Sequence, residues 1–203
     1  MGGSGGVDED KRATLRRFAA LGAASPFVGL ASADDSGSDT PGAIAGYVAA
    51  TPGAHFSKIR DDLSLGTGEA QHHLRRLVRE GTLETRKDGD FRRYFPAGRF
   101  DDTEQVTLGY LRRETPRGIL IALIREPGIG PSILADRLGV SRPAISSAAA
   151  DLEAAGLLDR NDGYTLAQPT TVLVLIVAYA DSFGPDAAAL AAEAPEYVVY
   201  EPR

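Results

Sequence analysis

Apolar residues and turn-forming glycines recur along this chain at a constant distance of 75 positions. The matching pairs are Ile44 and Ile119, Val48 and Leu123, Gly53 and Gly128, Leu63 and Leu138, Leu77 and Leu152, Gly81 and Gly156, and Leu83 and Leu158. The same offset holds without a gap from the first expected helix into the first expected strand. Such self-similarity predicts a tandem repeat of one small domain.

Each copy of the repeat has the apolar spacing of three helices. The expected ranges are 42–50 and 117–125 for the first helix, and 67–80 and 142–155 for the third. Between them, Ser57 and Ser132 are each expected to cap a short second helix. Gly81 and Gly156 are expected to end the third helix, because glycine adopts the left-handed conformation without a Cβ clash.

Two short β-like runs follow the third helix of each copy. They are expected at 82–86 and 91–95 in the first copy, and at 157–160 and 164–166 in the second. Asp88-Gly89-Asp90 separates the first two runs, and aspartate-glycine between alternating segments is a strong hairpin signal. The predicted fold class is therefore mainly α with small β-hairpin wings. It comprises two tandem winged helix-turn-helix domains plus a C-terminal helix.

Three segments of the first copy resemble those of a known family. They are 52–59 (PGAHFSKI), 71–77 (QHHLRRL) and 88–96 (DGDFRRYFP). With the second copy, they are similar to the tandem winged-helix regulators of archaea, relatives of the arsenic-repressor-like and multiple-antibiotic-resistance-like groups. The resemblance covers about residues 41–166 and implies a DNA-binding transcription regulator. It implies no particular operator or ligand.

These patterns divide the chain into five expected parts. They are a flexible N-terminal arm (1–40), a DNA-reading winged helix-turn-helix domain (41–99), a linker helix (100–114), a second winged helix-turn-helix domain (115–168) and a C-terminal helical segment (169–203). In the arm, Arg16-Arg17 precedes a short apolar run, which is loosely similar to a twin-arginine export signal. Because Pro26 and several glycines dilute that run, an arm with a short helix is the preferred interpretation.

The third helix of the first copy separates apolar from basic residues. On a helical wheel Ala70, Leu74 and Leu77 share one side. A recognition helix needs this division, because one face holds it to the domain while the other enters the major groove. Arginine there can pair with guanine, and Gln71 can read adenine. The residues expected to contact DNA, from this helix and the wing, are Thr67, Gly68, Gln71, His72, Arg75, Arg76, Arg79, Arg86, Lys87, Arg92 and Arg93.

The distribution of charge favours DNA binding over a merely solvated helix face. The chain has 28 acidic and 22 basic residues and a net charge of −6. Segment 75–93, by contrast, holds seven basic and four acidic residues, a net charge of +3. The acidic excess, the alanine richness and the presence of only three lysines indicate a halophilic protein. In high salt, screening weakens the attraction to phosphates, so DNA contacts must be close.

The second copy lacks this basic chemistry. The face of its third helix opposite the expected core carries Pro143, Ser147, Ala150 and Ala154, and its wing offers only Arg160 as a cation. We therefore expect the second domain to be a structural, dimerising or sensing partner of the first.

Other chemistries find little support in the sequence. It has no cysteine, and His55, His72 and His73 are its only histidines, with no acidic residue at a chelating spacing. No metal site, cofactor or enzymatic activity is expected. The alternative to DNA binding is a winged-helix scaffold that binds only proteins. The arginines around Arg75 discriminate between the two, because a scaffold has no reason to concentrate arginine there.

A run after the second wing, 170–179, is apolar on nearly every face if it is helical. Such a helix belongs either to the core of the second domain or to a subunit interface. The interface is preferred, because a homodimer would match a two-fold symmetric DNA site. The run is shorter than the roughly 20 residues of a membrane-spanning helix. No membrane crossing and a cytoplasmic location are therefore expected.

Overall fold

The computed structural model describes residues 13–18, 40–161 and 163–197, which form two compact units divided between Gln105 and Val106. Most of the predicted flexible arm and Asp162 of the second hairpin turn lie outside the described residues. The described chain is mainly helical with small antiparallel hairpins, so the predicted fold class is confirmed. No helix in the described ranges is long and apolar enough to cross a membrane.

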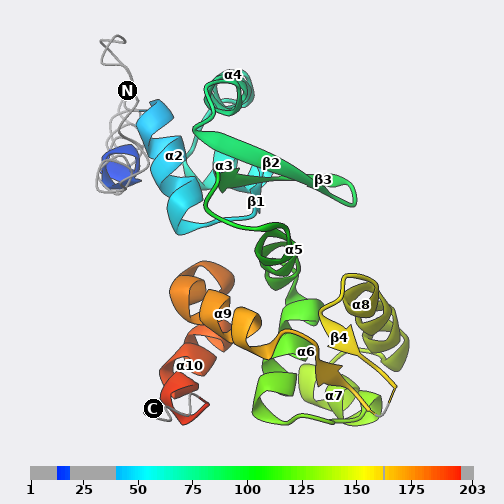
Figure 1. Ribbon diagram of the computed structural model, residues 1–203. Helices are drawn as coiled ribbons and strands as arrows, with labels where there is room; N and C mark the ends of the chain where they lie inside the picture. Colours follow the sequence, from blue (N-terminus) through cyan, green and yellow to red (C-terminus); the bar gives the residue numbers. More distant parts are fainter. Residues whose placement is uncertain (1–12, 19–39, 162, 198–203) are drawn as a thin grey trace, which may run out of the picture. The chain divides into compact units, whose positions relative to one another are not determined.

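The first unit contains three main helices and a small sheet (Figure 1). Its elements are α2 (Thr40–Ala50), β1 (Ala54–His55), α3 (Phe56–Asp62), α4 (Thr67–Arg79), β2 (Leu83–Asp88) and β3 (Phe91–Pro96). The next helix, α5 (Asp102–Leu111), includes the division between the two units. The sheet is three-stranded, because β1 pairs with β3 in addition to the predicted β2–β3 hairpin. The β2–β3 hairpin is therefore joined to β1, the strand just before α3, through β3, which is the central strand of the sheet.

The core of the first unit joins α2, α3, α4 and the inner face of the sheet. Its fully buried side chains include Ile44, Ile59 and Leu74. Residues 13–18 form a further helix, drawn in dark blue beside α2 in Figure 1. Leu15 of this helix is buried in the same core, and the Phe18 ring lies edge-on against Tyr47 at 5.2 Å between centroids. Residues 13–18 therefore differ from the predicted flexible arm, because they contribute apolar side chains to the domain.

The second unit repeats the backbone of the first. Its elements are α6 (Glu114–Arg125), α7 (Pro131–Leu138), α8 (Arg142–Ala154), β4 (Leu158–Asp159) and β5 (Thr165–Leu166). Gly81 and Gly156, which follow the two third helices, have φ values of 72° and 71°. Their next residues, Thr82 and Leu157, each donate a backbone hydrogen bond to the carbonyl five positions earlier, at 3.0 and 2.9 Å. The tandem repeat predicted from the sequence is therefore present in the backbone.

The starts of the short second helices correct one prediction. Ser57 and Ser132 do not cap α3 and α7, because each is the second residue of its helix. His55 caps α3 instead, and α7 begins at Pro131, whose fixed φ suits a first helical position. The serine signal was misleading because neither true cap is a serine, threonine, aspartate or asparagine.

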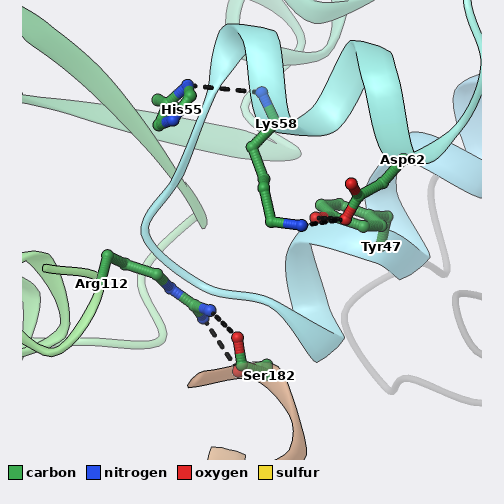
Figure 2. A network of polar contacts seen from close by, with 6 residues as sticks. All are labelled: Tyr47, His55, Lys58, Asp62, Arg112 and Ser182. Atoms are coloured by element: carbon green, nitrogen blue, oxygen red, sulfur yellow. Dashed lines mark hydrogen bonds and ion pairs between the residues drawn. The ribbon is translucent and has the colours of Figure 1, made fainter. Parts of the chain in front are cut away.

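The C-terminal helices complete the second unit. They are α9 (Pro169–Phe183), which has a kink at Tyr179, α10 (Pro185–Glu193) and the 3₁₀ turn η1 (Ala194–Glu196). Most of the apolar side chains of α9 are buried within this unit, namely Val172, Leu173, Leu175 and Ile176. Arg112 donates hydrogen bonds to the backbone carbonyl and the hydroxyl of Ser182, at 2.6 and 3.0 Å (Figure 2). The apolar run is thus mainly a core element, although the large apolar side chains of Val174 and Val177 are exposed, at 57% and 45%.

Candidate nucleic-acid interface

Helix α4 presents a polar face to solvent. Ala70, Leu74 and Leu77 are buried at 0%, 1% and 6% exposure and hold the helix against the core. Six of the residues predicted to contact DNA lie exposed on the rest of the helix: Thr67, Gly68, Gln71, His72, Arg75 and Arg79. The seventh, Arg76, lies at the edge and forms an ion pair with Glu80 at 2.8 Å. The division into two faces predicted from the helical wheel is therefore present.

The beginning of α4 is fixed to α2 by one carboxylate. Glu69 accepts a hydrogen bond from the backbone N–H of Gly66 at 3.4 Å and another from the buried hydroxyl of Thr40 at 3.2 Å. The first contact satisfies an otherwise unpaired amide at the helix terminus. The second joins the first turns of two helices, so the exposed face of α4 has a defined orientation in the domain.

The register of the wing divides its four basic residues into two pairs. Lys87 stands opposite Arg92 on the face of the hairpin that also carries the buried Leu83. Arg86 stands opposite Arg93 on the other face. Successive side chains of a strand point to opposite faces, so neighbours in sequence are separated in space. Only the first pair lies on the side of the sheet that packs against the helices.

On the outer face of the wing, the basic side chains have acidic partners. Arg93 is only 3% exposed, forms an ion pair with Asp88 and donates a hydrogen bond to the carbonyl of Gly53 at 2.9 Å. Arg86 forms an ion pair with Asp102 at 2.7 Å. Arg93 was predicted to contact DNA, but its burial and its internal partners contradict that role. The error arose because the prediction counted charges without assigning them to faces of the strand.

On the inner face of the wing, positive charges from two elements come together. Burial raises the pKa of Tyr94, while the charges of Arg92 and Arg75 act on it in the opposite direction. The two charges that act on this phenol come from different elements, since Arg92 belongs to the wing and Arg75 to α4. Within the described ranges, no ion pair is found for Arg75, Arg79, Lys87 or Arg92. We call these four cations and the exposed face of α4 the α4–wing surface.

A second polar network supports α3 behind this surface. Lys58 and the hydroxyl of Tyr47 both donate to the carboxylate of Asp62, at 2.6 and 2.7 Å (Figure 2). His55 caps the same helix by accepting a hydrogen bond from the backbone N–H of Lys58 at 3.3 Å. Burial lowers the pKa of His55, and the charges of Arg93 and Lys58 lower it further. The imidazole is therefore held neutral, as its acceptor role requires.

The three histidines lie in two places, His55 beside the wing and the adjacent His72 and His73 on α4. His55 packs against the Phe91 ring at 5.0 Å between centroids, at the start of β3. His72 is exposed and His73 half-buried on α4, with their rings 5.2 Å apart. Among the described residues, no group of three histidine, aspartate or glutamate side chains is arranged to hold a metal ion. The capping role of His55 was not anticipated, because histidine is not a common cap residue.

In the second unit, the face of α8 opposite its buried side chains is uncharged, although Arg142 is exposed at the first position of the helix. Pro143, Ser147 and Ala154 are exposed on α8, while Ala150 is half-buried. Arg160 at its hairpin forms an ion pair with Glu153. The α8 face predicted to be neutral therefore remains so in the folded domain.

Two family models match the two copies of the repeat. A family described as an N-terminal HTH domain matches residues 38–108, and the MarR family matches residues 115–164. A curated protein of Methanocaldococcus jannaschii, named as an uncharacterized HTH-type transcriptional regulator, is 29% identical over 89 residues. That alignment covers 44% of this chain and 22% of the relative, so the chain spans only a small part of its length. The matches and the duplicated fold together make the chain similar to the tandem winged-helix regulators of the MarR-like type.

Proposed function

We propose that the protein binds duplex DNA with the α4–wing surface and thereby regulates transcription. The observation that carries this proposal is that exposed cations lie both on the outer side of α4, at Arg75 and Arg79, and on the inner face of the wing, at Lys87 and Arg92. A helix and a hairpin that present cations on one surface can contact the major groove and the neighbouring backbone together. The family matches support a DNA-binding regulator in general, and the choice of surface is our own inference.

Each part of the surface suits a different contact. The exposed side chains of Gln71 and Arg75 can form bidentate hydrogen bonds with adenine and guanine edges. Lys87 and Arg92, opposite each other on the wing, suit phosphates, which fix the register without reading sequence. Thr67, at the N-terminus of α4, is favourably placed for a phosphate as well, because helix N-termini attract anions.

A scaffold that binds only proteins is the alternative function. A scaffold would account for the fold. It would not explain why an acidic chain has four exposed cations, Arg75, Arg79, Lys87 and Arg92, with no acidic partner among the described residues. The neutral α8 face fits such a role better. We therefore assign DNA reading to the first domain and a structural, dimerising or sensing role to the second.

A mobility-shift titration tests the proposal. The full chain is incubated with duplex DNA from the upstream region of its own gene at several salt concentrations. Arg75→Ala should weaken specific binding by about 1–3 kcal/mol if it contacts a base. Arg142→Ala is the matched control, because Arg142 is an exposed arginine at the start of α8. Absence of binding by the wild type, or an equal loss in both variants, would refute the proposal.

We further propose that the protein acts as a homodimer in the cytoplasm. Val174 and Val177 lie three positions apart on α9 and are exposed large apolar side chains on a helix that buries Val172, Leu173, Leu175 and Ile176. Pairing of this strip with its copy would join two chains in one assembly, and two-fold symmetric DNA sites are commonly bound by such symmetric dimers. The cytoplasmic location follows from the proposed DNA partner.

A further inference from the structure

Arg93 lies in the central strand of the sheet and joins three parts of the first domain. Its guanidinium pairs with Asp88 at the end of β2 and donates to the carbonyl of Gly53 in the turn before β1. The same group lies 5.7 Å from the centre of the Phe91 ring, at the start of β3. Its side chain is 4% exposed, and that of Asp88 is 19% exposed. This buried group therefore ties both ends of the hairpin turn to the body of the domain.

The two residues of this ion pair are the sequence neighbours of Lys87 and Arg92, the two cations on the inner face of the wing. Asp88 follows Lys87 on β2, and Arg93 follows Arg92 on β3. Neighbouring side chains of a strand point to opposite faces, so the ion pair lies behind the cations and cannot touch what they touch. Fixing the backbone at Asp88 and Arg93 nevertheless fixes the backbone from which Lys87 and Arg92 project.

We propose that Arg93 is a positioning residue, with Asp88 as its partner, that orients the wing cations toward DNA. This inference rests on the proposed function and deepens it, because it assigns Arg92 to contact with DNA and Arg93 to a role through its neighbour. A long arginine side chain suits this role, since its planar group offers several N–H donors in fixed directions.

The proposal predicts an effect opposite in sign to that of simple electrostatics. Asp88→Ala removes a negative charge near a DNA-binding surface, so charge alone would tighten binding. If the ion pair orients the wing, the same substitution should weaken binding instead. Asp90→Ala is the matched control, because Asp90 lies exposed in the same hairpin turn, two positions away.

The experiment is a DNA titration of the full chain at several salt concentrations. Asp88→Ala should bind about tenfold more weakly. The slope of log affinity against log salt should fall by up to about 2, because two phosphate contacts are lost at about 0.9 each. Asp90→Ala should bind as well as the wild type or more tightly, with an unchanged slope. A folded domain with a misplaced wing changes the slope, whereas a smaller folded fraction lowers the apparent affinity and leaves the slope unchanged.

Charge-conserving variants provide the second measurement. Arg92→Lys should retain most of the binding, since lysine is a good phosphate ligand, whereas Arg93→Lys should lose binding as Asp88→Ala does. Circular dichroism at the assay temperature confirms that each variant is folded. Binding by Asp88→Ala that is as tight as that of the wild type, or tolerance of lysine at position 93, would overturn the inference while leaving the proposed function intact. Absence of binding by the wild type would overturn both.

Discussion

The Nδ1 atom of His55 accepts a hydrogen bond from the backbone N–H of Lys58 at 3.3 Å, and this contact makes an imidazole the N-terminal cap of α3. A protonated Nδ1 has no lone pair to offer, so the cap exists only in the neutral form. Burial and the nearby charges of Arg93 and Lys58 lower the pKa of His55, while Asp61 and Asp62 raise it to a smaller extent. The local charges and the cap therefore favour the same protonation state.

The free energy of unfolding should fall as pH decreases through the range in which His55 titrates. The unfolded chain binds the proton near the ordinary pKa of about 6.5, whereas the folded chain binds it only at lower pH. The contribution of His55 is thus complete above pH 6.5 and is lost between that value and the lower folded pKa. Urea unfolding of the wild type and of His55→Asn at pH 7.5 and 5.5 measures it, because asparagine caps without titrating. Equal pH dependence in both proteins would contradict this explanation.

Leu15 should contribute to the stability of the first domain although it precedes the repeat. Its side chain is 8% exposed and belongs to the same core as Ile44 and Leu74. Leu15→Ala should lower the free energy of unfolding by about 2 kcal/mol, the lower end for a buried leucine. Arg16→Ala, at the exposed neighbouring position, is the control and should have little effect. Thermal denaturation followed by circular dichroism compares them, and equal stability of both variants would show that residues 13–18 do not pack in solution.

Two positions on α9 should respond differently to a new charge. Leu175 is 4% exposed, so Leu175→Asp should unfold the second domain, because it buries an unpaired carboxylate. Val177 is 45% exposed, so Val177→Asp should leave the fold intact and prevent dimerisation. Light scattering beside circular dichroism separates the two effects. A wild-type protein that is folded and monomeric would exclude the proposed dimer.

The helices and the repeat could be predicted because their signals are local and periodic. Glycines at Gly81 and Gly156 end equivalent helices, and the apolar spacing around Leu74 and Leu152 defines equivalent faces. The two-residue strand β1 could not be found, since Ala54–His55 is too short to show alternation and its pairing with β3 joins residues about 40 positions apart. A strand this short is defined by its hydrogen-bonded partner strand, and that partner lies far away in the sequence.

The basic residues of the proposed site could be assigned to their elements from the sequence, but not to the faces of those elements. The sequence located the basic residues on α4 and the hairpin, yet treated Arg92 and Arg93 alike. Strand alternation, applied from the inward-facing Leu83, would have separated them, because the register places Arg92 on the side of Leu83 and Arg93 on the other. The partner of Arg86 was beyond such reasoning, since Asp102 lies sixteen residues away on another element.

The duplicated backbone has a consequence for how such a protein can change over evolutionary time. Ala150 holds in α8 the place that Arg75 holds in α4, 75 positions earlier, and Ala154 corresponds in the same way to Arg79. Neither alanine belongs to the fully buried set that fixes α8. Arginine at these two positions would give the second domain a basic helix without altering its core. A gain or loss of a nucleic-acid partner in this architecture therefore requires a few surface substitutions and no new fold.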